Sequence, residues 1–315
     1  MMKRLVWLAA PAVFLFASAA AAAPTKSFTA ASANLPGDTQ LVGTSSIKTV
    51  RSTKVFQSLF PQLLKSERDL NEANDKITKL CGIDAVKAID DVTIGVGKGD
   101  EAGIYVAMNG VSESKLVDCI TKLAKDEKEV ITSSKSGNIT ELKSDKSKKS
   151  VFFGWLTGDV LVVTSDPNNK ALLEKEMGGK GALAKSTVGA RLSRLSSDAA
   201  ISVVFDKELP MDGMKIKSGE LTVTVSGGNA TLNASFEMGS KKEAEDVAKF
   251  LNDLLNQSGM KKPPASVQKV AKTLSAKASN AEVKVTATAA ESDIISAFND
   301  LLNGSSGAGA APAKP

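Results

Sequence analysis

Along much of the chain, apolar and polar residues alternate over short stretches that are separated by turn residues. A two-residue period of this kind is typical of half-buried β-strands. Residues 92–96 and 103–108 form one such pair on either side of a glycine-rich turn. Further hairpins are predicted at residues 151–165, 220–238 and 273–289, and single strands at residues 40–47 and 199–206.

Between these strands, apolar residues recur every three to four positions, which predicts amphipathic helices. One helix covers Val55 to Leu64 and contains Pro61, which kinks or breaks a helix. Residues 66–80 form the next helix, and Gly82 suits the position just past its end. Later helices are predicted to begin at Ser112, at Asp166 or Asn168, at Ser240 and at residue 292.

The order of these elements suggests two related units. In each half a hairpin is followed by a capped helix, and then by a second hairpin and helix. We therefore predict a degenerate internal duplication, with units at 35–178 and 190–303 and a linker at 179–189. Small and polar residues predict flexible segments at 23–34 and 304–315. The expected fold class is α+β, with antiparallel sheets and helices packed on one face.

The glycine run G-V-G-K-G at 95–99 raises the question of a phosphate-binding loop. A dinucleotide fingerprint needs G-x-G-x-x-G before a helix, and a Walker loop needs Gly-Lys followed by Ser or Thr. Here Lys98 is followed by Gly99, and a strand comes next. The run therefore favours the turn of a hairpin, and no cofactor is predicted.

The first residues predict export. Lys3 and Arg4 precede a nearly apolar stretch at 5–17, and small residues follow. Cleavage is expected after Ala22, because a cut one residue later would leave Pro24 first. No later apolar run reaches membrane-spanning length. The mature chain is therefore expected in the periplasm or outside the cell, without an integral membrane segment.

The amino-acid composition argues against several classes of function. The chain has no histidine, which removes the commonest general base and the commonest zinc ligand. A formal net charge of +5 is spread along the chain and accompanies few aromatic residues. A nucleic-acid-binding surface typically has clustered arginines and stacking aromatic residues, so nucleic-acid binding is not expected.

Two cysteines remain, Cys81 and Cys119. An even number in an exported chain favours a disulfide between them. The alternative is two buried free thiols. A C-x-x-C redox motif is absent, and two thiols without histidine make a poor zinc site.

Two sets of residues could carry chemistry. The segments S-S-I-K at 45–48, S-G-N at 136–138 and K-S-G at 217–219 follow the order of the penicillin-recognising serine enzymes. In a chain rich in Ser and Lys, such matches arise by chance. Asp90–Asp91 and the D-P-N-N run at 166–169 could bind a cation, although the run is more simply a helix-capping turn. No catalytic or metal-binding residue is predicted.

Two short motifs occur in order in the first half of the chain. They are L-P-G-D-T-Q-L-V from residue 35 and C-G-I-D from residue 81, which precedes a hairpin. This order resembles exported bacterial proteins grouped only as domains of unknown function. The likeness covers roughly residues 35–125. It implies an envelope or secreted role and transfers no catalytic residue.

These observations predict a non-enzymatic exported protein that binds an envelope protein or has a structural role in the cell envelope. A second hypothesis is a periplasmic carrier of an apolar ligand, held between sheet and helices by Phe152, Phe153, Trp155 and Phe205. The third and weakest is a hydrolase that uses a Ser/Lys pair or carboxylates.

Overall fold

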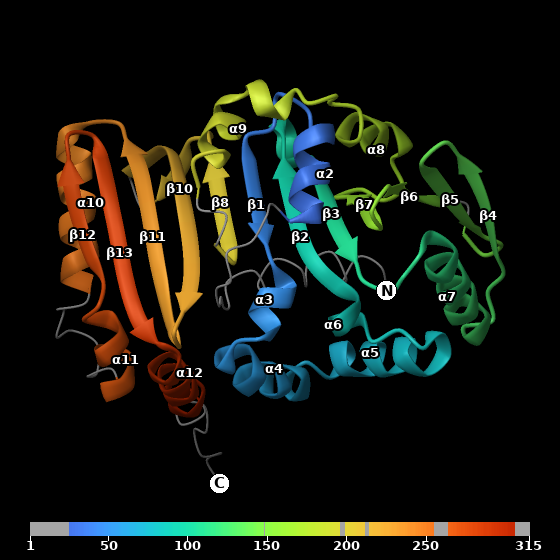
Figure 1. Ribbon diagram of the computed structural model, residues 1–315, viewed down its shortest axis with the longest axis horizontal. Helices are drawn as coiled ribbons and strands as arrows, with labels where there is room; N and C mark the ends of the chain where they lie inside the picture. The colour runs from blue at the N-terminus through green and yellow to red at the C-terminus, as the bar shows by residue number, and fades with distance from the viewer. Residues whose placement is uncertain (1–24, 148, 196–198, 212–213, 255–263, 306–315) are drawn as a thin grey trace, which may run out of the picture.

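The computed structural model describes residues 25–147, 149–195, 199–211, 214–254 and 264–305 (Figure 1). The predicted signal peptide at 1–22 and the last ten residues lie outside these ranges. The strands are β1 (Leu41–Ser45), β2 (Ile89–Val96), β3 (Ala102–Met108), β4 (Ile131–Ser136), β5 (Ile139–Ser144), β6 (Ser150–Leu156), β7 (Val160–Thr164), β8 (Ile201–Phe205), β9 (Leu209–Met211), β10 (Met214–Ser226), β11 (Asn229–Met238), β12 (Ser275–Ser279) and β13 (Glu282–Ala290).

The helices cover the remaining regular segments of the described chain. They are α2 (Lys26–Asn34), α3 (Ile47–Arg51), α4 (Lys54–Ser66), α5 (Arg68–Cys81), α6 (Ala85–Ala88), α7 (Glu113–Asp126), α8 (Lys170–Glu176), α9 (Thr187–Leu192), α10 (Lys241–Leu254), α11 (Ala265–Ala271) and α12 (Glu291–Ser305), with the short 3-10 turns η2 (Lys98–Asp100) and η3 (Leu183–Lys185).

All described strands join in one antiparallel sheet (Figure 1). Its order is β12-β13-β11-β10-β8-β1-β2-β3-β7-β6-β5-β4, and β9 pairs with β10. The predicted α+β class with antiparallel pairing is confirmed. The sheet is continuous through both predicted units, because β1 of the first pairs with β8 of the second.

Helices lie on both faces of this sheet, so the expectation that they pack on one face is wrong. One face, which we call the α2 face, carries Val42, Tyr105 and Val204, and α2 packs on it with buried Ala31. The opposite face, which we call the α10 face, carries Phe205 and receives α10. Two further clusters beneath α3 to α7 and α12 fill other parts of the interior.

The strand order is similar on the two sides of the β1–β8 pair. Outward from β1 come the hairpin β2–β3 and then the hairpin strands β7 and β6; outward from β8 come β10–β11 and then β13 and β12. The helices α7 and α10 follow the first hairpin in each half. The hairpin β4–β5 has no counterpart among the described strands of the second half. This order does not show that the units are repeats, and the duplication stays a prediction.

The segment 23–34 was predicted to be flexible, which is wrong for most of its length. Residues Lys26–Asn34 form α2, whose N-cap Thr25 accepts a hydrogen bond from the Phe28 amide. The helix places Ala31 at 0% exposure in the core. The small and polar composition of this segment did not indicate that it packs in the core, because only a narrow stripe of α2 is buried.

The predicted linker at 179–189 is also largely structured. It contains η3 and the start of α9, and it buries Leu183 and Val188 in the same cluster as α2. The amides of Gly179 and Gly181 donate to the carbonyls of Asn34 and Ala33, each at 2.7 Å. The segment therefore connects the two halves and also covers the core.

A buried polar group anchors the start of α2. The Ser27 amide donates to Asp91 Oδ1 at 2.6 Å, and the Ser27 hydroxyl lies 2.9 Å from that of Thr93. Asp91 is only 6% exposed. Asp91 thereby supplies an acceptor for a helix N–H that has no partner within the helix.

The two cysteines form a disulfide, as predicted. Cys81 is the last residue of α5, and Cys119 lies within α7, where it is 5% exposed. Gly82 follows in the left-handed conformation, with φ of 64°, and ends α5 as its position predicted. The bond fixes α5 to α7, beside the hairpin β2–β3.

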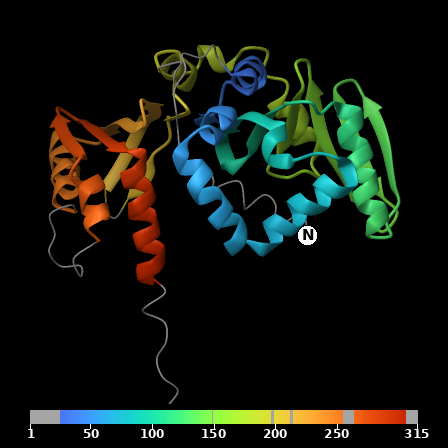
Figure 2. The same cartoon turned by 60° about the horizontal axis from the view of Figure 1, so that its bottom comes forward.

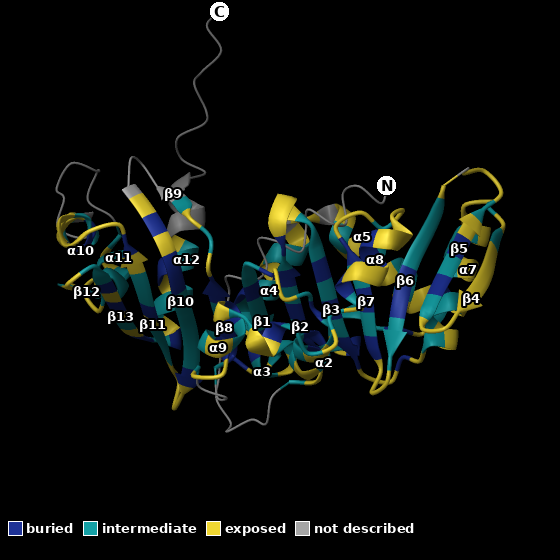
Figure 3. Cartoon of the chain, turned by 90° about the horizontal axis from the view of Figure 1, so that it is seen from above, coloured by how far each residue is buried: buried dark blue, intermediate teal, exposed yellow. Residues whose placement is uncertain are grey.

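The two outer strands of the sheet differ in how their free backbone groups are satisfied. At β12, the side chain of Asn252 on α10 donates to the Ala276 carbonyl at 2.9 Å and accepts from the Ala276 amide at 3.1 Å. One side-chain amide thus satisfies both backbone groups of one residue at this edge. At the other margin, residues 132–136 of β4 are all exposed (Figure 3).

Within the part of the chain that the structure describes, no helix combines the length and the apolar character needed to cross a membrane.

Replacing Asp91 with alanine should destabilise the protein by about 1–3 kcal/mol, because the buried Ser27 amide would lose its acceptor. Urea denaturation measures the loss, and amide exchange in α2 should accelerate. The control is Asp100→Ala, since Asp100 pairs with Lys207 at the surface and its side chain is 83% exposed. A loss in the control equal to that in Asp91→Ala would contradict the anchoring role.

Replacing both cysteines with serine should lower the free energy of unfolding by about 3–4 kcal/mol, because the disulfide closes a long loop in the unfolded chain. The sequence separation of the two cysteines is 38 residues. Thiol titration of the denatured, unreduced protein checks the bond itself. Two reactive thiols there would show that it does not form in the isolated protein.

Candidate binding face

The glycine-rich segment that could have bound phosphate is a hairpin turn. Residues Lys98–Asp100 form η2 between β2 and β3, and Gly99 takes the left-handed conformation with φ of 77°. The chain then continues as a strand. No helix N-terminus follows the glycines, so the arrangement that holds phosphate in nucleotide-binding loops is missing.

The three pieces of the Ser/Lys motif are not brought together. Ser45 is buried in β1, 136–138 are the last residue of β4 and the turn that follows it, and 217–219 lie on β10. Five strand spacings separate β1 from β5, which is about 24 Å. On β10, Val223 is the residue in line with Ser45 through Ile201, so 217–219 lie at least about 13 Å further along the strand.

The candidate carboxylates have structural partners. Asp91 accepts from the start of α2, and Asp90 lies 3.7 Å from Arg51. In the D-P-N-N run, Asn169 caps α8 by accepting from the Leu172 amide. The described residues contain no group of three or more carboxylates and cysteines that could hold a metal ion.

The four aromatic residues proposed to line an apolar cavity lie apart. Phe152 packs against the α2-face cluster, Trp155 against the cluster beneath α5 and α7, and Phe205 belongs to the α10-face cluster. Phe153 is 4% exposed in β6. They do not line a common space.

An open surface formed by polar strand residues covers β10, β11 and β13 on the α2 face. Among the described helices none covers these three strands, although α9 borders them, whereas α2 lies over β2 and β3 (Figure 1). Strand register places nine polar side chains side by side there. They form three rows, Ser218–Glu237–Glu282, Glu220–Ser235–Lys284 and Thr222–Asn233–Thr286.

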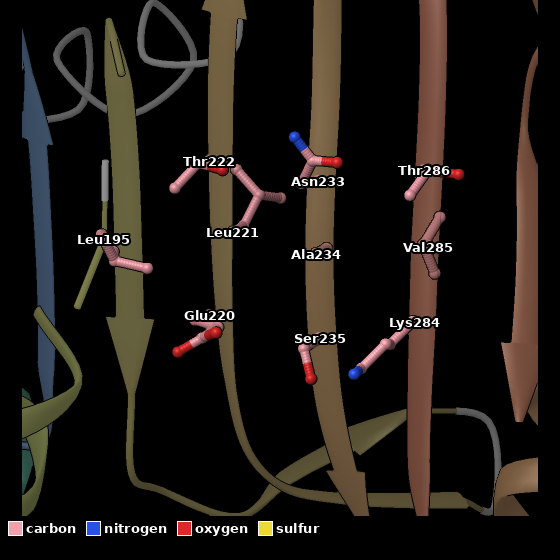
Figure 4. Close-up of a pocket in the computed structure, with 10 residues that line it drawn as sticks. All are labelled: Leu195, Glu220, Leu221, Thr222, Asn233, Ala234, Ser235, Lys284, Val285 and Thr286. Carbon is pink, nitrogen blue, oxygen red and sulfur yellow. The ribbon is translucent and has the colours of Figure 1, made fainter. Parts of the chain in front are cut away.

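Two adjoining hollows mark this surface. The first has a volume of about 200 Å³ and is lined by the second and third of these rows, with Leu195 at its margin (Figure 4). Figure 4 shows Lys284 extending toward Ser235. The second hollow has a volume of about 430 Å³ and lies between the strands and α9. Glu220 and Ser235 line both, so the two form one groove, which we call the polar groove.

Most of the charges in the polar groove are paired. Arg191 Nη2 lies 3.1 Å from Glu237 Oε2, and the Ser218 hydroxyl donates to the same oxygen at 2.8 Å. The hydrogen bond from Ser218, together with the Arg191 guanidinium, holds the pKa of Glu237 below its usual range. The Ser235 hydroxyl donates to Glu282 at 2.5 Å. These pairs fix the side chains in place.

Two opposite charges in the groove have no such pairing. Glu220 on β10 and Arg194, just past α9, both line the second hollow. Neither forms an ion pair or a side-chain hydrogen bond with the described residues. The groove therefore presents one available carboxylate and one available guanidinium beside a strip of hydroxyl and amide groups.

Strand register also identifies the residues of the first half that correspond in position to the polar groove. The β1–β8 pair is centred on Gly43 and Val203, so Thr44 and Val204 occupy related positions. Outward from Thr44 come Thr93, Tyr105 and Val162, all buried. Outward from Val204 come Glu220, Ser235 and Lys284 of the polar groove. The same part of the sheet is a covered core in one half and an open polar surface in the other.

Sequence reasoning missed the polar groove, although one signal was present. In T-V-T-V and N-A-T-L-N-A-S, alternate residues are polar, which indicates a strand face in contact with water. The adjacency of the three strands comes from a long-range pairing of β11 with β13. Periodicity within one segment does not specify such a pairing.

Comparisons with known proteins give no family. No family model matches the chain, and no curated protein matches it. Among solved structures, crystal form I of TP0453 aligns at a TM-score of 0.48 and 10% identity, covering 86% of this chain and 97% of that one. Crystal form III of TP0453 aligns at 0.45 and 9%, covering 85% and 96%. Likenesses at this level transfer no residue and no activity.

Proposed function

We propose that the chain is an exported, non-enzymatic binding protein of the bacterial cell envelope, and that the polar groove is its binding surface. The observation that carries this proposal is the open strip over β10, β11 and β13, where ordered hydroxyl, amide and charged side chains surround two adjoining hollows. The export pattern at the N-terminus and the disulfide support an extracytoplasmic role.

The chemistry of the groove suits a polar segment of another protein. Its pair of available opposite charges, Glu220 and Arg194, would recognise a segment that carries both an amine and a carboxylate. The lining contains no aromatic residue on which a sugar ring or a base could stack. The chain lacks histidine, and its Ser/Lys motif is dispersed, which supports a role without catalysis.

Site-specific photo-crosslinking in the exporting bacterium tests this function. A photoreactive residue at Thr222, within the groove, should yield a discrete adduct with an envelope protein. The same residue at Thr121, an exposed site on α7, serves as the control and should not yield it.

A charge reversal sharpens the result. Glu220→Lys should abolish the Thr222 adduct, because it removes the available carboxylate without disturbing a buried contact. Glu245→Lys, on the exposed side of α10, should leave the adduct unchanged. An adduct that persists with Glu220→Lys, or that forms equally from Thr121, would count against the groove as the binding surface.

A second function, the carrier of an apolar ligand, is favoured by a feature of the α10 face. Four half-buried residues lie in one row across its centre and belong to none of the core clusters formed by the described residues. They are Val203, Ile94, Ile104 and Val163, with Gly43 between the first two. The helices α4 and α5 contact mainly other helices, α12 and α7 among them, rather than the strands of the sheet (Figure 2).

Fluorescence titration with 11-dansylaminoundecanoic acid tests the carrier function. If an acyl chain lies on this row, Ile94→Lys should weaken probe binding about tenfold or more, because it places a charge on the apolar surface. Thr222→Lys, on the opposite face, should leave binding unchanged. Equal binding by Ile94→Lys and the parent protein would exclude this site.

A further inference from the structure

Glu176 is a buried acid without a compensating partner. It is the last residue of α8 and is 1% exposed. Its Oε1 atom has no hydrogen-bond partner in the described structure. Its backbone carbonyl accepts a hydrogen bond from the hydroxyl of Tyr105, which is itself fully buried. An ionised carboxylate at such a place is strongly disfavoured relative to water.

The strand beneath leaves room for this side chain. A Cβ atom at Gly103 of β3 would lie 2.8 Å from Glu176 Oε2, so any larger residue there would displace the carboxyl group. Leu173, one turn earlier on α8, is 0% exposed and belongs to the cluster that includes α2. The acid group therefore lies at the contact between α8 and the central sheet.

The chain just after Glu176 is fixed to α2. Gly179 and Gly181 donate to carbonyls at the C-terminal end of that helix. A Cβ atom at Gly179 would lie 2.0 Å from the Leu35 carbonyl oxygen, so the two segments are in close backbone contact. Movement of Glu176 would thus disturb α8, the following turn and α2 together.

The surrounding charges do not neutralise Glu176. Lys175 Nζ lies 2.7 Å from Glu101 and 3.9 Å from Asp38, so the neighbouring cation is engaged by other carboxylates. From β3, Tyr105 faces the same site as an uncharged phenol, since burial raises its pKa. Burial raises the pKa of Glu176 to about 7; Lys175 opposes this shift, and Asp38 and Glu101 add to it.

We propose that Glu176 is a proton-controlled latch on the layer formed by α2, α8 and the segment between α8 and η3. As a neutral acid it keeps this layer closed over the sheet. When it ionises, the layer opens, because the carboxylate reaches water only by leaving its site above Gly103. Opening uncovers the part of the α2 face that matches the polar groove in the second half. The proposal does not depend on the groove having a ligand.

The expected pH dependence follows from the direction of the shift. A carboxyl group whose pKa is raised by folding binds its proton more tightly in the closed form. The stability of the closed layer is therefore greatest at low pH, falls as pH rises from about 4.5 to about 7, and is then constant. Between pH 5 and pH 8, the equilibrium constant for opening should rise roughly 70-fold.

Amide hydrogen exchange at pH 5 and pH 8, expressed as protection factors, tests the latch. Protection in α2 and α8 should fall with rising pH in the parent protein, whereas protection in α10 should not. Glu176→Gln keeps the shape without the charge and should remove the pH dependence. The matched control is Glu174→Gln, on the exposed side of α8, which should behave like the parent protein.

Two outcomes would overturn the latch. One is a pH-dependent loss of protection in Glu176→Gln as large as in the parent protein; the other is equal protection of α8 at both pH values in the parent. If Glu176→Gln does not fold, carbon-13 NMR titration of the Glu176 carboxyl in the parent protein decides the matter. A midpoint near pH 7 supports the latch, and a midpoint near the ordinary value of about 4.5 refutes it.

Discussion

The antiparallel pairing of β1 with β8 is the contact on which the rest of this structure depends. Five residues of each strand are in register, from Leu41 with Phe205 to Ser45 with Ile201. Through this one ladder, two sets of hairpins become a single sheet with a continuous α2 face and α10 face. Every row of side chains that crosses the molecule passes through it, including the row that leads to the polar groove.

Local sequence signals predicted much of the fold. The glycine turn before β3, the turn between β6 and β7, the cap Ser112 and the stop at Gly82 depend on neighbours within a few residues, and these are the neighbours a sequence displays. Cap recognition was still imperfect, because Asp166 or Asn168 was expected where Asn169 serves. The cysteine pairing followed from their even number and the export signal.

The features that sequence reasoning missed depend on long-range contacts. The helix α2 has a weak apolar stripe, and its anchor Asp91 is 64 residues from Ser27. The exposed strand β4 carries no apolar periodicity, so it resembles a loop. The polar groove needs the register of three strands, and the isolation of Glu176 needs the burial of its surroundings. Such properties belong to the packed chain and are not encoded in any short segment.

The two outer strands differ in whether a side chain bonds to their edge backbone groups, and this difference affects how the sheet can be extended. Asn252 already satisfies the backbone groups of Ala276 on β12, so an added strand would have to displace a side chain that supplies both hydrogen bonds. Of the two terminal strands in the described sheet, β4 has no side chain bonded across its edge in this way, so strand addition is expected there first. Two chains that met there in antiparallel fashion would each cover the edge of the other's β4. A pair formed at β4 would leave β12, with its Asn252 contact, as the outer strand of each chain.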